Sequence, residues 1–218
     1  MIYRISFIED DEAAKAEVRV HLEKEFEFVD IPLYKGKEPI YKELKYLVED
    51  IFNSKLDAIV IDFSFFDKAG DIKFDGAELT DAIQEKMLGF PVFVLSARPE
   101  AESSVSDVNL VYNKGEYYKN SKILNNRIKL QIGHYREKIS DAEKRLKELL
   151  KKQEGKEELT LNEEEELIKL DDFLESTQLS SIKVPLTLKE TSNIKKLNEL
   201  IIDTQKLIKE IEEKGKDA

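Results

Sequence analysis

Acidic, hydroxyl and amine side chains follow four apolar runs within the first 114 residues of this 218-residue chain. Glu9 and Asp10 follow the first run, Asp62 the second, Ser96 the third and Lys114 the fourth. Short apolar runs bounded by polar residues are typical of buried parallel strands, whose carboxyl ends meet at one edge of a sheet. We therefore expect these five side chains to project from the same sheet edge.

Carboxylates that converge at such an edge repel one another unless a cation neutralises their charge. Their hard oxygen atoms are the ligands that Mg²⁺ prefers. A hydroxyl and an ammonium group opposite the metal would suit the remaining oxygens of a bound phosphoryl group. The residue types would therefore suit a divalent cation together with a bound phosphoryl group at this sheet edge.

Strands and helices that alternate along the chain must position these side chains. The expected strands cover residues 2–8, 26–33, 56–62, 91–95 and 109–112, and the expected helices cover 12–25, 40–52 and 75–88, with room for a short helix within 99–108. This order predicts a five-stranded, parallel, doubly wound α/β sheet with helices on both faces and right-handed crossovers.

Long helices replace this alternation after about residue 118, so we divide the chain into domains 1–118 and 119–218. Heptad spacing predicts long helices over about 119–153 and 189–213, with a shorter helix over about 162–178 between them. The apolar seam of the first long helix consists of Ile128, Ile132, Tyr135, Ile139, Ala142, Leu146 and Leu149. The two long helices could fold back on each other or face a second copy of the chain, and the sequence leaves both arrangements open.

Charge and composition narrow the function classes. Residues 1–118 hold 14 Lys and Arg against 25 Asp and Glu, whereas residues 119–218 hold 21 of each. Neither part has the basic excess of a nucleic-acid-binding module. The chain has no cysteine and two histidines, which excludes thiolate chemistry and leaves little room for a zinc site or a Ser-His-Asp triad. With no run long enough to span a bilayer and an acidic start unlike a signal peptide, we expect a cytoplasmic protein without a membrane partner.

Five pieces of sequence resemble the receiver domain of two-component response regulators, of the chemotaxis-regulator type, over about residues 1–118. They are IEDD after the first strand, IVIDFSF at the third, DGAEL at the next helix, PVFVLSA at the fourth strand and YNKG at the fifth. The resemblance implies a flavodoxin-like sheet with strand order 2-1-3-4-5, followed here by an all-α segment.

The resemblance also implies a role for each matched residue. Asp62 would accept a phosphoryl group from a histidine kinase or a phosphotransfer protein, Ser96 would turn toward the acyl phosphate, and Lys114 would pair with it. The Mg²⁺ ligands would be Glu9, Asp10, Asp62 and the backbone carbonyl of Ser64. Any enzymatic activity would be at most self-phosphorylation and autodephosphorylation at Asp62, and the output would pass through protein–protein contacts of the helices.

Some positions depart from the family pattern. Gly115 follows Lys114, where the family usually has proline, and Val111 stands where the family has a switch aromatic, with Tyr112 beside it. The connection from Asp62 to the next helix, 14 positions long, exceeds the usual turn, and the stretch between residues 96 and 114 is short. The acceptor site therefore matches the family better than the usual readout surface does.

Three other classes of protein share part of this pattern. Haloacid-dehalogenase-type phosphatases carry a second Asp two residues after the nucleophile, and Ser64 at that place argues against them. His134 lies on a long helix, but its neighbours do not match a kinase histidine box. The remaining alternative is a non-phosphorylated, receiver-like adaptor or scaffold that uses its helices for partner binding or dimerisation.

Overall fold

A computed structural model describes residues 2–36, 38–64, 74–98, 101–155 and 159–177 of the chain. The chain divides into two compact units, and the division falls inside the long helix α6 (Ser121–Glu154), after Ser140. Each unit is described by itself below. No helix among the described residues has the length and apolar character needed to cross a membrane.

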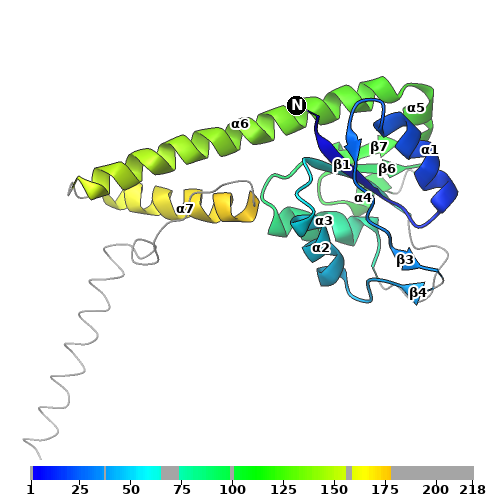
Figure 1. The fold of residues 1–218 in the computed structure, drawn as a ribbon, viewed down its shortest axis with the longest axis horizontal. Helices are drawn as coiled ribbons and strands as arrows, with labels where there is room; N and C mark the ends of the chain where they lie inside the picture. The colour runs from blue at the N-terminus through cyan, green and yellow to red at the C-terminus, as the bar shows by residue number, and fades with distance from the viewer. Residues whose placement is uncertain (1, 37, 65–73, 99–100, 156–158, 178–218) are drawn as a thin grey trace, which may run out of the picture. The chain divides into compact units, whose positions relative to one another are not determined.

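A five-stranded parallel sheet forms the centre of the first unit (Figure 1). Its strands are β1 (Arg4–Ile8), β2 (Glu27–Phe28), β5 (Ala58–Asp62), β6 (Val92–Ser96) and β7 (Val111–Asn113). They lie in the order β2-β1-β5-β6-β7, and every neighbouring pair is parallel. This is the 2-1-3-4-5 order of flavodoxin-like folds, so the predicted fold class is confirmed.

The central strands are apolar on both sides because both sheet faces are covered. Every residue of β5 and β6 is buried, as is every residue of β1 after Arg4. Strands buried on both faces read as continuous apolar runs rather than as alternating patterns, which is why the sequence marks them clearly.

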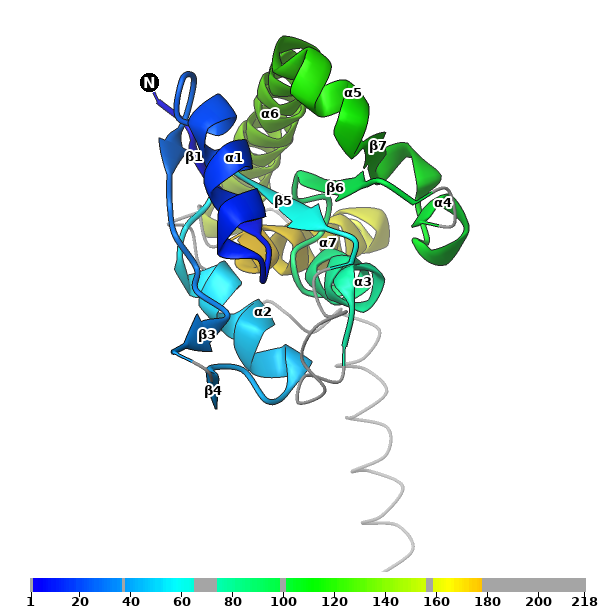
Figure 2. The ribbon, with the colours of Figure 1, turned by 90° about the vertical axis from the view of Figure 1, so that its right-hand side faces the viewer.

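Helices cover the two faces of the sheet (Figure 2). On one face, α1 (Glu12–Leu22) and the first part of α6 contribute Val18, Leu22 and Ile128 to a core shared with the strands. On the other face lie α2 (Leu44–Asn53) and α3 (Gly76–Lys86), which contact each other, and α3 packs on β5 and β6.

The region after β1 and α1 differs from the expected long strand at residues 26–33. Only Glu27 and Phe28 join the sheet. Pro32 in the same stretch has no N–H to donate to a ladder. A small antiparallel hairpin follows, formed by β3 (Tyr34–Lys35) and β4 (Glu38–Pro39). Two-residue strands leave no periodic signal in a sequence, so the hairpin was not predicted.

Short helical segments surround the last strand. The expected short helix is α4 (Ala101–Ser104), and a 3₁₀ turn at Val108–Leu110 precedes β7. Helix α5 (Lys114–Lys119) begins directly after β7, because the side chain of Asn113 accepts the backbone N–H of Glu116 and caps the helix. The first residue of α5 is therefore held by both strand and cap.

The second unit contains an antiparallel helical hairpin between the end of α6 and α7 (Leu161–Thr177). Two ion pairs join the helices: Arg145 Nη2 lies 2.8 Å from Glu166 Oε2, and Lys152 Nζ lies 2.8 Å from Glu163 Oε1. The buried apolar residues of the hairpin are Ala142, Leu146, Leu149, Leu167 and Leu174. The helix expected at 189–213 lies outside the described residues.

Candidate functional site

The carboxyl edge of the sheet brings together the ends of four strands. Asp62 and Ser96 are the last residues of β5 and β6, whereas Glu9 and Lys114 directly follow β1 and β7. In the ladder, Asp62 lies beside Leu95, one residue before Ser96. The parallel register therefore places all four residues at one edge, as the sequence predicts.

Lys114 joins two of the carboxylates. Its Nζ lies 2.6 Å from Asp62 Oδ1 and 2.9 Å from Glu9 Oε2. The side chains of Lys114, Glu9 and Asp62 are only 17%, 4% and 9% exposed. Charge-assisted hydrogen bonds are stronger in such a shielded place than at the surface. The ammonium group thus holds two buried carboxylates in one cluster.

The acidic residues that follow β1 have different structural roles. Glu9 Oε1 accepts the backbone N–H groups of Asp10 and Asp11, at 3.0 and 3.2 Å. The Asp11 side chain caps α1 by accepting the N–H groups of Ala13 and Ala14. Helix capping therefore accounts for Asp11, while Glu9 is buried beside Lys114. Asp10, which lies between Glu9 and Asp11 in the sequence, is half-buried.

The turn after β5 fixes the direction of the Asp62 carboxylate. The backbone N–H of Ser64 donates to Asp62 Oδ2 at 2.9 Å, while Asp62 Oδ1 faces Lys114. Each carboxylate oxygen consequently has its own partner. The carbonyl of Ser64, a proposed ligand, belongs to the same turn.

Ser96 has a different environment from the one expected of a residue facing Lys114. Its Oγ donates to the carbonyl of Arg98 at 3.1 Å and accepts the N–H of Arg98 at 2.9 Å. The hydroxyl is thus engaged in its own turn. Nothing in the sequence pointed to Arg98, because a main-chain partner depends on turn geometry rather than on residue type.

Burial and the paired charges at this site act in opposite directions on the pKa values of Asp62 and Lys114. Burial raises the pKa of Asp62, and the nearby charge of Glu9 raises it further, although Lys114 acts in the opposite direction. Burial alone would lower the pKa of Lys114, but the hydrogen bonds and charges of Asp62 and Glu9 outweigh burial and raise it. Lys114 is therefore protonated, and it is the only ammonium group among the described residues that pairs with both Asp62 and Glu9.

The residues fit a hard divalent cation in chemistry and in charge. Glu9, Asp10 and Asp62 offer carboxylate oxygens, and the excess negative charge favours a cation. No group of three Asp, Glu or His side chains is gathered as a metal site in the part of the chain that the structure describes. Lys114 lies between the two buried carboxylates instead, so a metal would share them with the ammonium group.

The residues near the family's switch position lie on opposite faces of the sheet. Val111 packs against a cluster of Ala77, Val94 and Val105 on the α3 side. Tyr112 points the other way: its ring lies 5.8 Å from that of Phe93, and its hydroxyl accepts from Arg127 of α6 at 3.2 Å. Tyr112 thus does not lie where the family's switch aromatic would, at the position that Val111 occupies here.

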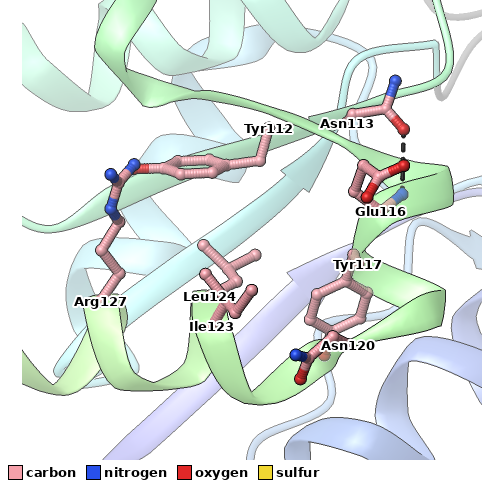
Figure 3. Close-up of a pocket in the computed structure, with 8 residues that line it drawn as sticks. All are labelled: Tyr112, Asn113, Glu116, Tyr117, Asn120, Ile123, Leu124 and Arg127. Carbon is pink, nitrogen blue, oxygen red and sulfur yellow. Dashed lines mark hydrogen bonds between the residues drawn. The ribbon is translucent and has the colours of Figure 1, made fainter.

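Tyr112 instead lines a groove between β7, α5 and α6, with a volume of about 180 Å³ (Figure 3). The other lining residues are Asn113, Glu116, Tyr117, Asn120, Ile123, Leu124 and Arg127. The side chain of Lys114 faces Glu9 and Asp62 rather than this groove, so the groove and the carboxylate cluster are separate features.

No family model and no curated protein matches the chain. Among solved structures, it is similar to a Francisella response regulator 1452 receiver domain, at 17% identity over 61% of this chain and 98% of the other, with a TM-score of 0.42. A receiver domain of a modulated diguanylate cyclase from Desulfovibrio desulfuricans G20 has 16% identity over 60% and 99% of the two chains, with a TM-score of 0.39. A yeast Spc42 trimeric coiled-coil segment fused to another protein has 18% identity over 71% and 93%, with a TM-score of 0.46.

Similarities at these identities and TM-scores carry no argument about function. The strand order and the parallel pairing of the sheet, seen directly in this structure, are those that the resemblance to receiver domains implies. The resemblance is therefore confirmed at the level of the fold alone: this chain has a flavodoxin-like sheet, as receiver domains do, followed by long helices.

Proposed function

We propose that this chain is a response-regulator-type signalling protein that accepts a phosphoryl group on Asp62 in a Mg²⁺-dependent reaction. The observation that carries the proposal is the position of Lys114 Nζ, 2.6 Å from Asp62 and 2.9 Å from Glu9, at the carboxyl edge of the sheet. A buried carboxylate beside a fixed ammonium group provides both a nucleophile and a stabiliser for phosphoryl oxygens.

In the proposed reaction, a carboxylate oxygen of Asp62 attacks the phosphorus atom of a phosphohistidine donor. The bond between the imidazole nitrogen and phosphorus breaks, the imidazole takes up a proton, and an acyl phosphate forms. Lys114 stabilises the negative charge on the transferring oxygens, and the Ser64 N–H keeps the carboxylate directed. Attack by water on the phosphorus atom then breaks the bond to the Asp62 oxygen, releases inorganic phosphate and restores the Asp62 carboxylate.

Glu9, Asp10, Asp62 and the backbone carbonyl of Ser64 are the proposed holders of Mg²⁺. When bound, the ion supplies further charge neutralisation at the phosphoryl oxygens. Lys114 already pairs with two of these carboxylates. The affinity of the site for Mg²⁺ therefore depends on whether Lys114 pairs with the carboxylates or with a phosphoryl group.

Ser96 is the proposed link from the site to the rest of the domain. Its hydroxyl exchanges the main-chain partners that Arg98 provides for an oxygen of the acyl phosphate, and residues 96–98 thereby move between two states. The chain is thereby a signalling protein and not a metabolic enzyme.

The proposed partners follow from this scheme. A histidine kinase or a phosphotransfer protein is the donor, and the helices after residue 118 contact the output partner or a second copy of the chain. The acidic domain 1–118 makes nucleic acid an unsuitable ligand.

One observation favours the alternative, a receiver-like adaptor that is not phosphorylated. Lys114 already pairs with Glu9 and Asp62, and the Ser96 hydroxyl has its hydrogen-bond partners within its own turn, so these side chains have partners without a phosphoryl group. In that case the domain would only present its helices to a partner.

Binding of beryllofluoride, which mimics a phosphoryl group on a carboxylate, separates the two candidates. We expect the full chain to bind it only in the presence of Mg²⁺, and Asp62→Asn to bind none, as measured by ¹⁹F NMR. Asp141→Asn removes an exposed carboxylate of the second unit and should bind like the wild type. Equal binding by Asp62→Asn, or no binding by the wild type, would overturn the phosphoacceptor proposal.

A further inference from the structure

Gly76, the first residue of α3, lies directly against the main chain of Asp62 and Phe63 at the end of β5. A Cβ atom on Gly76 would lie 2.5 Å from the carbonyl oxygen of Asp62, 2.9 Å from Phe63 Cα and 3.0 Å from the Phe63 carbonyl oxygen. All three atoms belong to the backbone, so no side-chain rotation can make room. Any residue other than glycine must displace either α3 or the end of β5.

Helix α3 is firmly held at this contact. Asp75 and Glu78 form a capping box at its start, and Thr80 Oγ1 donates to the Gly76 carbonyl at 2.7 Å. Leu79 and Ile83 are fully buried on the next turns. Because the helix is anchored by its cap and by its core residues, it resists moving away from the sheet.

The other side of the contact is the turn that directs the acceptor carboxylate. Phe63 connects Asp62 to Ser64, and the N–H of Ser64 holds Asp62 Oδ2 at 2.9 Å. The N–H of Phe63 donates to the Leu95 carbonyl on β6 at 2.9 Å. A shift of the main chain at Phe63 therefore changes the Ser64 hydrogen bond and the direction of the Asp62 carboxylate together.

We propose that Gly76 is a positioning residue of the acceptor site. Without a side chain at Gly76, α3 can seat on the Asp62–Phe63 main chain and fix the turn that orients the Asp62 carboxylate and the Ser64 carbonyl. This inference rests on the proposed phosphoacceptor function and adds to it a residue that touches neither phosphoryl group nor metal. In the sequence, Gly76 belongs to the DGAEL piece at the start of a helix, and its contact with the main chain of Asp62 and Phe63 is visible only in the structure.

The test compares Gly76→Ala with the wild type for beryllofluoride binding in the presence of Mg²⁺. Misplacement of a reacting group by about 1 Å can lower activity by about 10²-fold. We expect Gly76→Ala to bind at least about tenfold more weakly, by the same reasoning. Circular dichroism and the thermal unfolding midpoint establish that the variant is folded.

Two controls separate positioning from a general loss of stability. Asp75→Ala removes the capping box of the same helix without adding an atom at the contact, so it should lower the unfolding midpoint and leave the affinity unchanged. Gly133→Ala makes the same substitution in α6, where a Cβ meets no atom within 4 Å, and should leave both quantities as in the wild type or slightly raise the midpoint.

The outcomes distinguish this inference from the proposed function. No binding by the wild type overturns the proposed function and the inference with it. Wild-type binding that Gly76→Ala matches overturns only the inference, as does a loss of affinity in Asp75→Ala as large as in Gly76→Ala. If Gly76→Ala does not fold, amide NMR of the wild type decides: beryllofluoride must shift the Gly76 resonance together with that of Ser64, and an unmoved Gly76 overturns the inference.

Discussion

Two buried carboxylates, Glu9 and Asp62, share the single ammonium group of Lys114 at the edge of the sheet. This ratio of charged groups determines how a substitution at each of the three residues affects the site. Lys114 stabilises Asp62 and Glu9 together, but it cannot fully neutralise both. Breaking a shielded ion pair by removing one partner leaves charge that is neither solvated nor compensated. Removing the charge of Lys114 should therefore make the site more negative, whereas removing the carboxylate of Asp62 should make it less negative.

Lys114→Met should separate phosphoryl transfer from metal binding. We expect phosphorylation by a small phosphodonor to slow by about 10²-fold or more, because preorganised charge stabilisation at the transferring oxygens is lost. Mg²⁺ affinity should rise or stay unchanged, since the competing ammonium group is gone. The two quantities can be measured by donor-dependent phosphorylation rates and by Mg²⁺ titration of the protein.

Lys119→Met is the matched control, because Lys119 lies on the same helix, its side chain is 74% exposed, and it pairs with the exposed Glu116 at 2.7 Å. It should leave both quantities unchanged. Weaker Mg²⁺ binding in Lys114→Met would contradict the view that Lys114 and the metal share the same carboxylates.

Asp62 should make stability depend on pH. Burial and the charge of Glu9 raise the pKa of Asp62 in the folded state, so the folded protein holds this proton at pH values where the unfolded chain has released it. The contribution of Asp62 to stability is then present at low pH and is lost as the pH rises through the folded-state pKa. The unfolding free energy of the wild type minus that of Asp62→Asn should accordingly fall as the pH rises above about 4, the ordinary pKa of Asp.

Urea unfolding of both proteins at several pH values measures this difference. Taking the difference removes the contributions of Glu25 and other carboxyl groups, whose pKa values are lowered by partners elsewhere in the fold. A difference that rises with pH would mean that Lys114, and not burial, dominates the environment of Asp62.

At the scale of elements, the sequence predicted what rests on apolar runs and not what rests on local main-chain geometry. The strands of Asp62 and Ser96 were identifiable because strands covered on both faces are apolar throughout. The β3–β4 hairpin turns at Gly36, where φ is +67°, and its strands are too short to show a period. The engagement of Ser96 by Arg98 was unpredictable for the same reason, since it depends on the shape of one turn.

Besides its apolar contacts, α6 is attached to the sheet by an ion pair that the heptad pattern does not reveal. Arg136 Nη2 lies 2.5 Å from Asp57 Oδ1, at the start of β5, and Asp57 also accepts the N–H of Arg4 at 2.7 Å. Arg136 further lies over the ring of Tyr3, at 4.9 Å. Asp57 is buried, so it relies on these donors for its charge.

Arg136→Met should therefore lower the unfolding free energy by about 2 kcal/mol, the scale for losing hydrogen bonds to a charged group. Lys144→Met breaks an exposed pair with Asp141, with side chains 71% and 67% exposed, and should cost only a few tenths of a kcal/mol. Urea unfolding of the full chain compares the two. Equal losses would show that the Asp57 pair behaves as a surface contact.

At the scale of the whole molecule, the heptad seam of α6 has its partners within the chain. All seven of its apolar residues, from Ile128 to Leu149, are at most 7% exposed. Ile128 and Ile132 belong to the core of the first unit, while Leu146 and Leu149 are buried in the second. The sequence left open whether this seam faces a second copy, because a heptad pattern is the same for both arrangements.

The last prediction tests this assignment through concentration. Leu146→Ala should lower the unfolding free energy by about 2–5 kcal/mol, as expected for truncating a fully buried leucine. Since the lost contacts lie within one chain, the loss should be the same at protein concentrations about a hundredfold apart. An interface between copies behaves differently, because mass action stabilises it more as the concentration rises. A loss that depends on concentration would therefore place a second copy on this seam, and a loss that does not would leave any self-association to other surfaces of the chain.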